Sequence, residues 1–267
     1  MRSLPGAIAL AGLLALSGAP RVTAQEAVLT VTIIYDNYRA DPACGTDWGF
    51  SCLIEGAGKT VLFDSGTRED LFLKNAAALG LDLARVDLAV LSHFHGDHTG
   101  GLDAALGARP GLTIHVPADG GEGAAELAER WRKAGAGIVR ADGPVELAKG
   151  VFLTGTMGTA IREQAMALDT GRGLVVITGC AHPGIAAMVE KAREATGRPV
   201  RAVLGGFHLG AAGEPEVGRI IARFKEMGVS RVGASHCTGD RAVAQFRAAY
   251  GDGFIELGAG RVVKFEK

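Results

Sequence analysis

A short apolar run at residues 88–91 ends abruptly in three histidines and one aspartate, and this stretch constrains the fold more than any other. The polar residues are His93, His95, Asp97 and His98. Side chains alternate between the two faces of a strand, so His93 and His95 can point the same way where the strand ends. The glycine-bounded loop then turns Asp97 and His98 toward a second position. Imidazole and carboxylate suit borderline divalent metals, zinc above all, so the segment predicts a metal site directly after a buried strand.

Strand-like runs recur along the chain, rich in β-branched residues and bounded by glycine and aspartate. They cover residues 28–34, 51–55, 60–63, 88–91, 112–116, 151–154, 174–178, 200–204, 232–235, 254–257 and 261–265. Apolar residues at helical spacing fall between them, over residues 69–79 and after Pro183 and Pro215. Strands first, then an alternation of strands and helices, favour a layered α/β domain.

At least one histidine follows each of four strand-like runs. The first histidines after these runs are His93, His182, His208 and His236. Side chains that leave separate strand ends can converge in space despite their separation along the chain. His115 is different, because it lies inside a strand-like run, and we predict that it is structural.

The N-terminus has the three parts of a cleavable signal peptide. Arg2 is positively charged, residues 7–16 are apolar but too few to span a bilayer, and residues 22–24 fit a small-residue cleavage site. We predict a signal peptide over residues 1–24, one domain over residues 25–267, and a periplasmic or secreted location. Cleavage leaves 26 basic and 29 acidic residues, a net charge of −3. This charge points to neither nucleic acid nor a membrane surface as a partner.

Four cysteines in an oxidising compartment raise the question of a disulfide. Cys180 and Cys237 belong to histidine-containing segments, and we interpret them as site residues. Cys44 and Cys52 either bridge a short loop or stay free, since spacing alone does not show the geometry of a disulfide.

Seven segments resemble a known family and run in the expected order over nearly the whole mature chain. They are residues 34–37, 52–55, 62–66, 91–102, 179–182, 205–209 and 235–239. The fourth carries the HxHxDH signature of the metallo-β-lactamase superfamily. The chain resembles the branch named for 7,8-dihydropterin-6-yl-methyl-4-(β-D-ribofuranosyl)aminobenzene 5'-phosphate synthase. The resemblance implies an αββα sandwich, with two sheets face to face, flanking helices and a site at one edge.

The resemblance also implies how the metal ligands divide between two positions. His93 and His95 belong to the first position, and Asp97 and His98 belong to the second. His236 fits the late histidine that joins the second position. One or two zinc ions are expected, with manganese or iron as alternatives.

A third histidine is expected at the first position, together with a carboxylate that bridges both positions. We interpret His182 as that histidine, because it projects from a strand-to-helix loop. No aspartate lies between Pro183 and Ser235 to serve as the bridge. Cys180 and His208 are the alternatives, since thiolate and imidazole both bind zinc. A site without a bridging carboxylate would bind its second ion weakly or hold only one.

Four further residues are predicted to support the site or to line it. Asp64 ends a strand near the same edge, and the resemblance suggests that it fixes the histidine loop. The alternative for Asp64 is a turn aspartate bonded to local backbone. Asn37, Trp48 and Arg162 are candidate substrate contacts, Arg162 for an anionic group. Ordinary loop packing is the alternative for all three.

Three functions remain open at this point. The leading hypothesis is an exported zinc-dependent hydrolase, in which metal-bound hydroxide attacks an ester, amide, lactone or phosphodiester. Asp97 would then orient the water or accept its proton. The second hypothesis takes the branch name at face value, as a synthase of pterin-type cofactor assembly, although phosphorylated precursors are mostly cytoplasmic. The third is a non-catalytic periplasmic binder of metal or ligand, motivated by the missing aspartate. All three imply a small-molecule partner.

Overall fold

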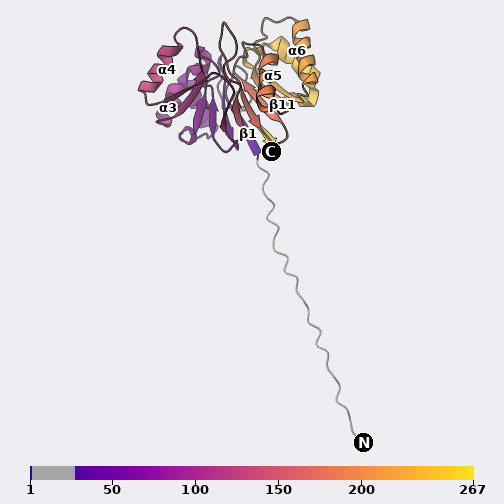
Figure 1. Cartoon of the computed structure of the whole chain (residues 1–267), viewed down its shortest axis with the longest axis horizontal. Helices are drawn as coiled ribbons and strands as arrows, with labels where there is room; N and C mark the ends of the chain where they lie inside the picture. Colours follow the sequence, from indigo (N-terminus) through magenta and orange to yellow (C-terminus); the bar gives the residue numbers. More distant parts are fainter. Residues whose placement is uncertain (2–27) are drawn as a thin grey trace.

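Two β-sheets lie face to face at the centre of the molecule, and helices cover the outer face of each sheet (Figure 1). The computed structural model describes Met1 and residues 28–267. The predicted signal peptide therefore falls, apart from Met1, outside the described residues and stays a prediction. The αββα sandwich predicted from the resemblance is confirmed.

The first sheet has seven strands in the order β13-β1-β2-β3-β4-β5-β6. Its strands are β1 (Val28–Tyr35), β2 (Ser51–Glu55), β3 (Val61–Phe63), β4 (Leu88–Val90), β5 (Thr113–Pro117), β6 (Gly137–Ala141) and β13 (Val262–Glu266). Pairing is antiparallel from β13 to β3 and parallel from β3 to β6.

The second sheet has six strands in the order β12-β11-β10-β9-β8-β7. Its strands are β7 (Val145–Ala148), β8 (Val151–Leu153), β9 (Met166–Asp169), β10 (Leu174–Thr178), β11 (Val200–Gly206) and β12 (Arg231–Ser235). Strands β10, β11 and β12 are parallel to one another. In β10, Val175 and Ile177 enter the core between the sheets, whereas Leu174 and Val176 face the helices. A strand that is buried on both faces reads as a continuous apolar run, which is why β10 is visible in the sequence.

The helices divide between the two outer faces according to their order in the chain. The first sheet is covered by α1 (Glu69–Ala78), α3 (Leu102–Ala108) and α4 (Ala124–Lys133), drawn in purple and magenta in Figure 1. The second is covered by α5 (Ile185–Thr196), α6 (Glu214–Glu226) and α7 (Asp240–Tyr250). The remaining helices are the four-residue α2 (Gly96–Thr99) and the single turns η1 (Leu83–Arg85), η2 (His236–Thr238) and η3 (Gly251–Gly253). None of the helices within residues 28–267 is both long and apolar enough to cross a membrane.

The strand predicted over residues 254–257 is wrong. Phe254 forms only an isolated bridge with Val232, and the chain then leaves the sheet edge. The side chains of Ile255 and Leu257 instead lie in the core between the sheets. These positions are apolar because they are buried, although they do not form a strand. Three short strands, β6, β7 and β9, were not predicted. Most residues of β6 and β7 are exposed or half-buried, so these edge strands lack an apolar run.

All four cysteines are free and buried. Cys52 lies in the core between the sheets, where burial raises the pKa of its thiol well above the usual value. Of the two alternatives for Cys44 and Cys52, a disulfide or free thiols, the structure shows free thiols.

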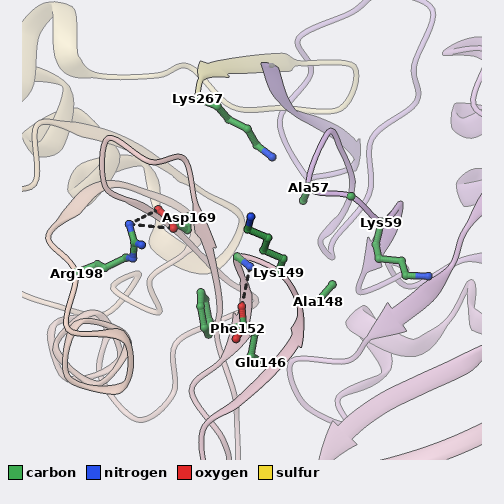
Figure 2. Close-up of a pocket in the computed structure, with 11 residues that line it drawn as sticks. Ala57, Lys59, Glu146, Ala148, Lys149, Phe152, Asp169, Arg198 and Lys267 are labelled. Carbon is green, nitrogen blue, oxygen red and sulfur yellow. Dashed lines mark hydrogen bonds and ion pairs between the residues drawn. The ribbon is translucent and has the colours of Figure 1, made fainter. Parts of the chain in front are cut away.

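A pocket lies near the starts of strands β3 and β11, at the edge away from the histidines, and Figure 2 shows the residues that line it. Lys59, Lys149, Arg198 and Lys267 line it together with two acidic residues. Arg198 is already paired with Asp169, at 3.0 Å. The histidines instead follow the carboxyl ends of β4, β10, β11 and β12. Ligands of open α/β sheets bind at that edge, so the candidate site is there.

Candidate metal centre

The HxHxDH segment forms a loop between β4 and α3 that is anchored at both ends. His95 precedes α2, and the short helix turns Asp97 and His98 back toward the sheets. His93 and His98 are fully buried, and the Asp97 side chain is 17% exposed. The structure brings His93 and His95 into one group of side chains and Asp97 and His98 into another, in the same division as predicted.

The first group consists of His93, His95 and His182, whose ligand atoms lie within 4.8 Å of one another. His93 Nε2 is 3.1 Å from His95 Nδ1, while Ser92 Oγ contacts the other ring nitrogen of His93 at 2.9 Å. His182 Nε2 is buried and has no hydrogen-bond partner among the described residues. Burial, followed by the neighbouring His208 and His95, lowers the pKa of His182 to about 4. A neutral imidazole with a free nitrogen is the form that binds a metal.

The second group consists of Asp97, His98, Cys180 and His236. Asp97 Oδ2 lies 3.5 Å from His98 Nε2 and 3.4 Å from His236 Nε2. Cys180 Sγ lies 3.2 Å from His98 Nε2 and 3.3 Å from His236 Nε2. Of the two candidates for the missing carboxylate, the thiol of Cys180 therefore reaches this group. His208 does not join either of these two groups.

Both histidines of the second group are oriented by a partner on their other ring nitrogen. Asp64 is fully buried, and its Oδ2 accepts from His98 Nδ1 at 2.8 Å. The Asp64 carboxylate also accepts from the backbone N–H and the hydroxyl of Ser92, both at 2.7 Å. Asn37 Oδ1 lies 2.9 Å from His236 Nδ1, and its amide donates to the His236 carbonyl at 3.0 Å. Such outer partners set the tautomer of a metal-binding imidazole, so each Nε2 is left free for a cation.

Asn37 was predicted as a substrate contact, and its observed contacts give a mutational prediction. Asn37→Ala removes both bonds to His236, so we expect the affinity for divalent metal to fall about 10- to 100-fold. Asn37→Asp is the matched control, because it keeps an acceptor for His236 Nδ1 and should lose less. Competition with a chromophoric chelator measures both affinities. Equal affinities for wild type and Asn37→Ala would contradict an orienting role for Asn37.

Strained backbone is concentrated at this site. Within residues 28–267, the non-glycine residues with positive φ are Asp64 (54°), Ala181 (65°), His208 (53°) and His236 (51°). Left-handed conformations are unfavourable for residues with a Cβ, and they persist only where the surroundings hold them. Asp64 accepts a hydrogen bond from the candidate ligand His98, and His208 and His236 are candidate ligands themselves. Ala181 separates Cys180 from His182.

Glu163 is a functional residue that the sequence analysis missed. Its fully buried carboxylate accepts from the backbone N–H groups of Cys180 (3.0 Å), Ala181 (2.8 Å) and His182 (2.8 Å). These bonds fix the loop that supplies one side chain to each metal group. No local pattern marks Glu163, because its partners lie 17–19 positions away along the chain.

The same carboxylate predicts a pH dependence for the metal-stripped protein. Burial outweighs the backbone hydrogen bonds and raises the pKa of Glu163 from 4.5 to about 7. The folded state therefore holds a proton that the unfolded state releases, and stability from this group is full below pH 4.5. It is lost as the pH rises through about 7. Urea unfolding across this range, in the presence of a chelator, should show the decline. Glu163→Gln should flatten it, and an equal slope in this variant would assign the decline to other groups.

The other two predicted substrate residues, Trp48 and Arg162, belong to neither metal group. Trp48 is 53% exposed, and its ring centroid is 4.9 Å from that of His236. Arg162 is partly exposed, adjoins Glu163 in the chain and is loosely paired with Asp119 at 3.8 Å. His115 belongs to neither group, and burial lowers its pKa.

Comparison with known proteins decides the family. The profile of the metallo-beta-lactamase superfamily matches residues 48–213. The chain belongs to this superfamily. One superfamily relative is the 7,8-dihydropterin-6-methyl-4-(β-D-ribofuranosyl)-aminobenzene-5'-phosphate synthase of Methanocaldococcus jannaschii. It is 30% identical, and the alignment covers 81% of this chain and 90% of the relative. The resemblance to this branch, noted from sequence motifs, is thus confirmed.

Two solved structures of the superfamily show the same fold. Tm1679, described as a metal-dependent hydrolase of the beta-lactamase superfamily, superposes with a TM-score of 0.73 and 28% identity over 90% of this chain and all of its own. YhfI from Bacillus subtilis superposes with a TM-score of 0.64 and 17% identity, over the same shares of the two chains. The second likeness concerns the fold alone.

The leading functional hypothesis, an exported zinc-dependent hydrolase, is wrong in the light of these comparisons, because the curated relative with 30% identity is a synthase. The error has a chemical reason. HxHxDH and its partner residues determine where cations bind, but they do not determine whether water or another nucleophile attacks.

Superfamily membership implies a divalent metal, and the donor set fits one. The first group offers three imidazole nitrogens, one of which, His182 Nε2, has no hydrogen-bond partner among the described residues. The second group offers two imidazole nitrogens, a carboxylate and a thiol. His93, His95 and His182 would hold one ion. Asp97, His98, Cys180 and His236 would hold another.

Proposed function

We propose that this protein is a zinc-dependent synthase that joins the 6-methyl carbon of a 7,8-dihydropterin to the nitrogen of a ribofuranosyl-aminobenzene phosphate. One observation carries the proposal: the 30% identity to the M. jannaschii synthase extends over 90% of that protein. The likeness is therefore not confined to a shared metal motif. Mixed imidazole, carboxylate and thiolate donors support zinc over magnesium or calcium.

The chemistry of the product defines what the site must do. A carbon–nitrogen bond forms, the amine loses a proton, and the methylene carbon loses a leaving group. A leaving group of the phosphate-ester class suits the site, because bound zinc is a Lewis acid toward such oxygens. Asp97 is the carboxylate of the two groups and is partly exposed, so we assign proton acceptance to it. The nitrogen of an alkylated arylamine is acidic while protonated, and a weak base is sufficient to take that proton.

Trp48 provides a test of how the substrates are held. Both proposed substrates contain flat aromatic rings, and the exposed Trp48 ring stands beside His236. Stacking on such a ring contributes about 0.5–1.5 kcal/mol, so Trp48→Ala should raise KM about 2- to 10-fold while kcat changes little. Trp48→Phe should restore most of the affinity. Steady-state kinetics with each variant measures the effect, and an unchanged KM in Trp48→Ala would remove Trp48 from the binding surface.

The function itself is tested with purified, zinc-loaded protein. The protein is incubated with 4-(β-D-ribofuranosyl)aminobenzene 5'-phosphate and a 7,8-dihydropterin whose 6-methylene carries a diphosphate. Mass spectrometry should detect the coupled product, and neither chelator-treated protein nor His93→Ala should form it. Release of phosphate without a coupled product would refute the synthase proposal. Metal binding without turnover of either substrate would instead favour a non-catalytic binder.

A further inference from the structure

Beside the two metal groups lies a third cluster of metal-binding side chains, formed by Cys180, His208 and Cys237. Their ligand atoms lie within 4.8 Å of one another. Tetrahedral zinc, with bonds of about 2.3 Å to sulfur and 2.0 Å to nitrogen, places two sulfurs and one nitrogen about 3.5–3.8 Å apart. A cation at the centre therefore needs only small movements of these side chains.

We propose that Cys180, His208 and Cys237 form an additional metal position that takes a thiophilic divalent cation such as Zn²⁺. The Cys180 thiolate is shared with the Asp97, His98 and His236 group. This position lies beyond the two that the HxHxDH segment helps to form, and the inference does not rest on the reaction proposed above.

The donor chemistry of the cluster differs from that of its neighbours. Two thiolates are soft ligands and imidazole is a borderline one, and this set selects zinc over magnesium and calcium. A thiolate can bind two cations at once, so Cys180 can serve both positions. Its negative charge, added to those of Asp97 and Cys237, offsets the repulsion between neighbouring cations.

The backbone around the cluster is built for close approach. A Cβ on Gly206 would lie 2.3 Å from the Gly179 carbonyl oxygen and 2.8 Å from Cys237 Sγ, so the three loops meet only because residue 206 is glycine. Thr238 Oγ1 accepts from the backbone N–H of Phe207 at 3.1 Å and ties the His208 loop to the Cys237 turn. His208 itself is held at φ 53°.

Among the described residues, the other two cysteines, Cys44 and Cys52, have no metal-binding side chains grouped with them, in contrast to Cys237. Cys44 and Cys52 are buried, and neither belongs to a metal-binding group within residues 28–267. Cys237, by contrast, lies within reach of a thiol and an imidazole. His208 is exposed, so an ion can enter from solvent, and a fourth coordination position stays open.

The test counts ions and sulfur–metal bonds rather than turnover. Metal-free protein, kept under reductant without oxygen, is titrated with Co²⁺, and the sulfur-to-cobalt charge-transfer band is recorded. Wild type should bind one equivalent more than Cys237→Ser. The band should lose about two thirds of its intensity in this variant, since two of three sulfur–cobalt bonds disappear. Elemental analysis of the zinc-loaded proteins should show the same difference of one ion.

A second variant and a control keep the result interpretable. His208→Asn removes the imidazole at an exposed position, and asparagine tolerates the left-handed backbone there. It should also lose one equivalent. Cys44→Ser removes a buried thiol outside the cluster and should match wild type. Equal ion counts and equal bands in wild type, Cys237→Ser and His208→Asn would overturn the proposal. A loss in Cys44→Ser as large as that in Cys237→Ser would also overturn it.

Discussion

Asp64→Asn should nearly abolish turnover although it changes neither the size of the side chain nor the backbone. Asparagine tolerates the positive φ of 54° at this position. With its amide nitrogen in place of Oδ2, it would present a donor to His98 Nδ1, 2.8 Å away in the native protein. His98 would then carry its proton on Nε2, the atom that faces Asp97 and Cys180. A protonated Nε2 cannot bind a cation.

The opposite orientation of the asparagine amide at position 64 is also unfavourable. It would place the NH₂ group against the backbone N–H of Ser92, which Asp64 Oδ1 accepts at 2.7 Å. Two donors would then face each other in a fully buried space, at a cost of about 1–3 kcal/mol. Either orientation therefore disturbs the histidine loop.

The expected magnitudes separate this effect from a general loss of stability. Metal affinity at the second group should fall about 10- to 100-fold, and turnover on the order of 10³- to 10⁴-fold, as for other imposed tautomers. Chelator competition measures the first, and ¹⁵N NMR of the imidazoles reports the tautomer of His98. Ser92→Ala is the matched control for the second group, because it removes a neighbour of Asp64 but leaves the Asp64 carboxylate on His98. It also removes the contact of Ser92 with His93, so only the affinity of the second group is compared. Native metal affinity in Asp64→Asn would show that Asp64 does not set the tautomer.

What the sequence reveals of this site depends on how local each contact is. His93, His95, Asp97 and His98 lie within six residues, so strand alternation and one turn were enough to divide them into two groups. The strands that carry the site are buried on both faces and appear as apolar runs. The short edge strands β6 and β7 have no such run, because most of their side chains face solvent.

Contacts between distant segments were beyond this kind of reasoning. Asn37 is a loop residue by sequence, and only the fold shows that both ends of its amide bind His236, 199 positions away. From the sequence, Cys180 and His208 were equally good candidates to replace the missing carboxylate, since both follow a strand end. The choice between them required the path of each loop, which left-handed residues at 181 and 208 determine.

Glu163→Ala should cause a large loss of stability in the metal-free protein. The substitution leaves the buried N–H groups of Cys180 and Ala181, and the partly buried N–H group of His182, without their common acceptor. Each orphaned donor costs about 1–3 kcal/mol, so we expect the free energy of unfolding to fall by about 4 kcal/mol. Urea unfolding near pH 6 with a chelator measures this change without any contribution from bound metal.

Glu163→Gln distinguishes the loss of acceptors from the loss of charge. The glutamine keeps one oxygen, which can still accept from the N–H groups of Cys180 and Ala181, while its amide faces the N–H of His182. We expect a smaller loss, about 1–2 kcal/mol, from that one opposed pair of donors. Because the loop supplies Cys180 and His182 to different groups, both variants should weaken both metal positions together, unlike Asp64→Asn. If Glu163→Ala unfolded within 0.5 kcal/mol of wild type, the loop would be held by packing and not by the carboxylate.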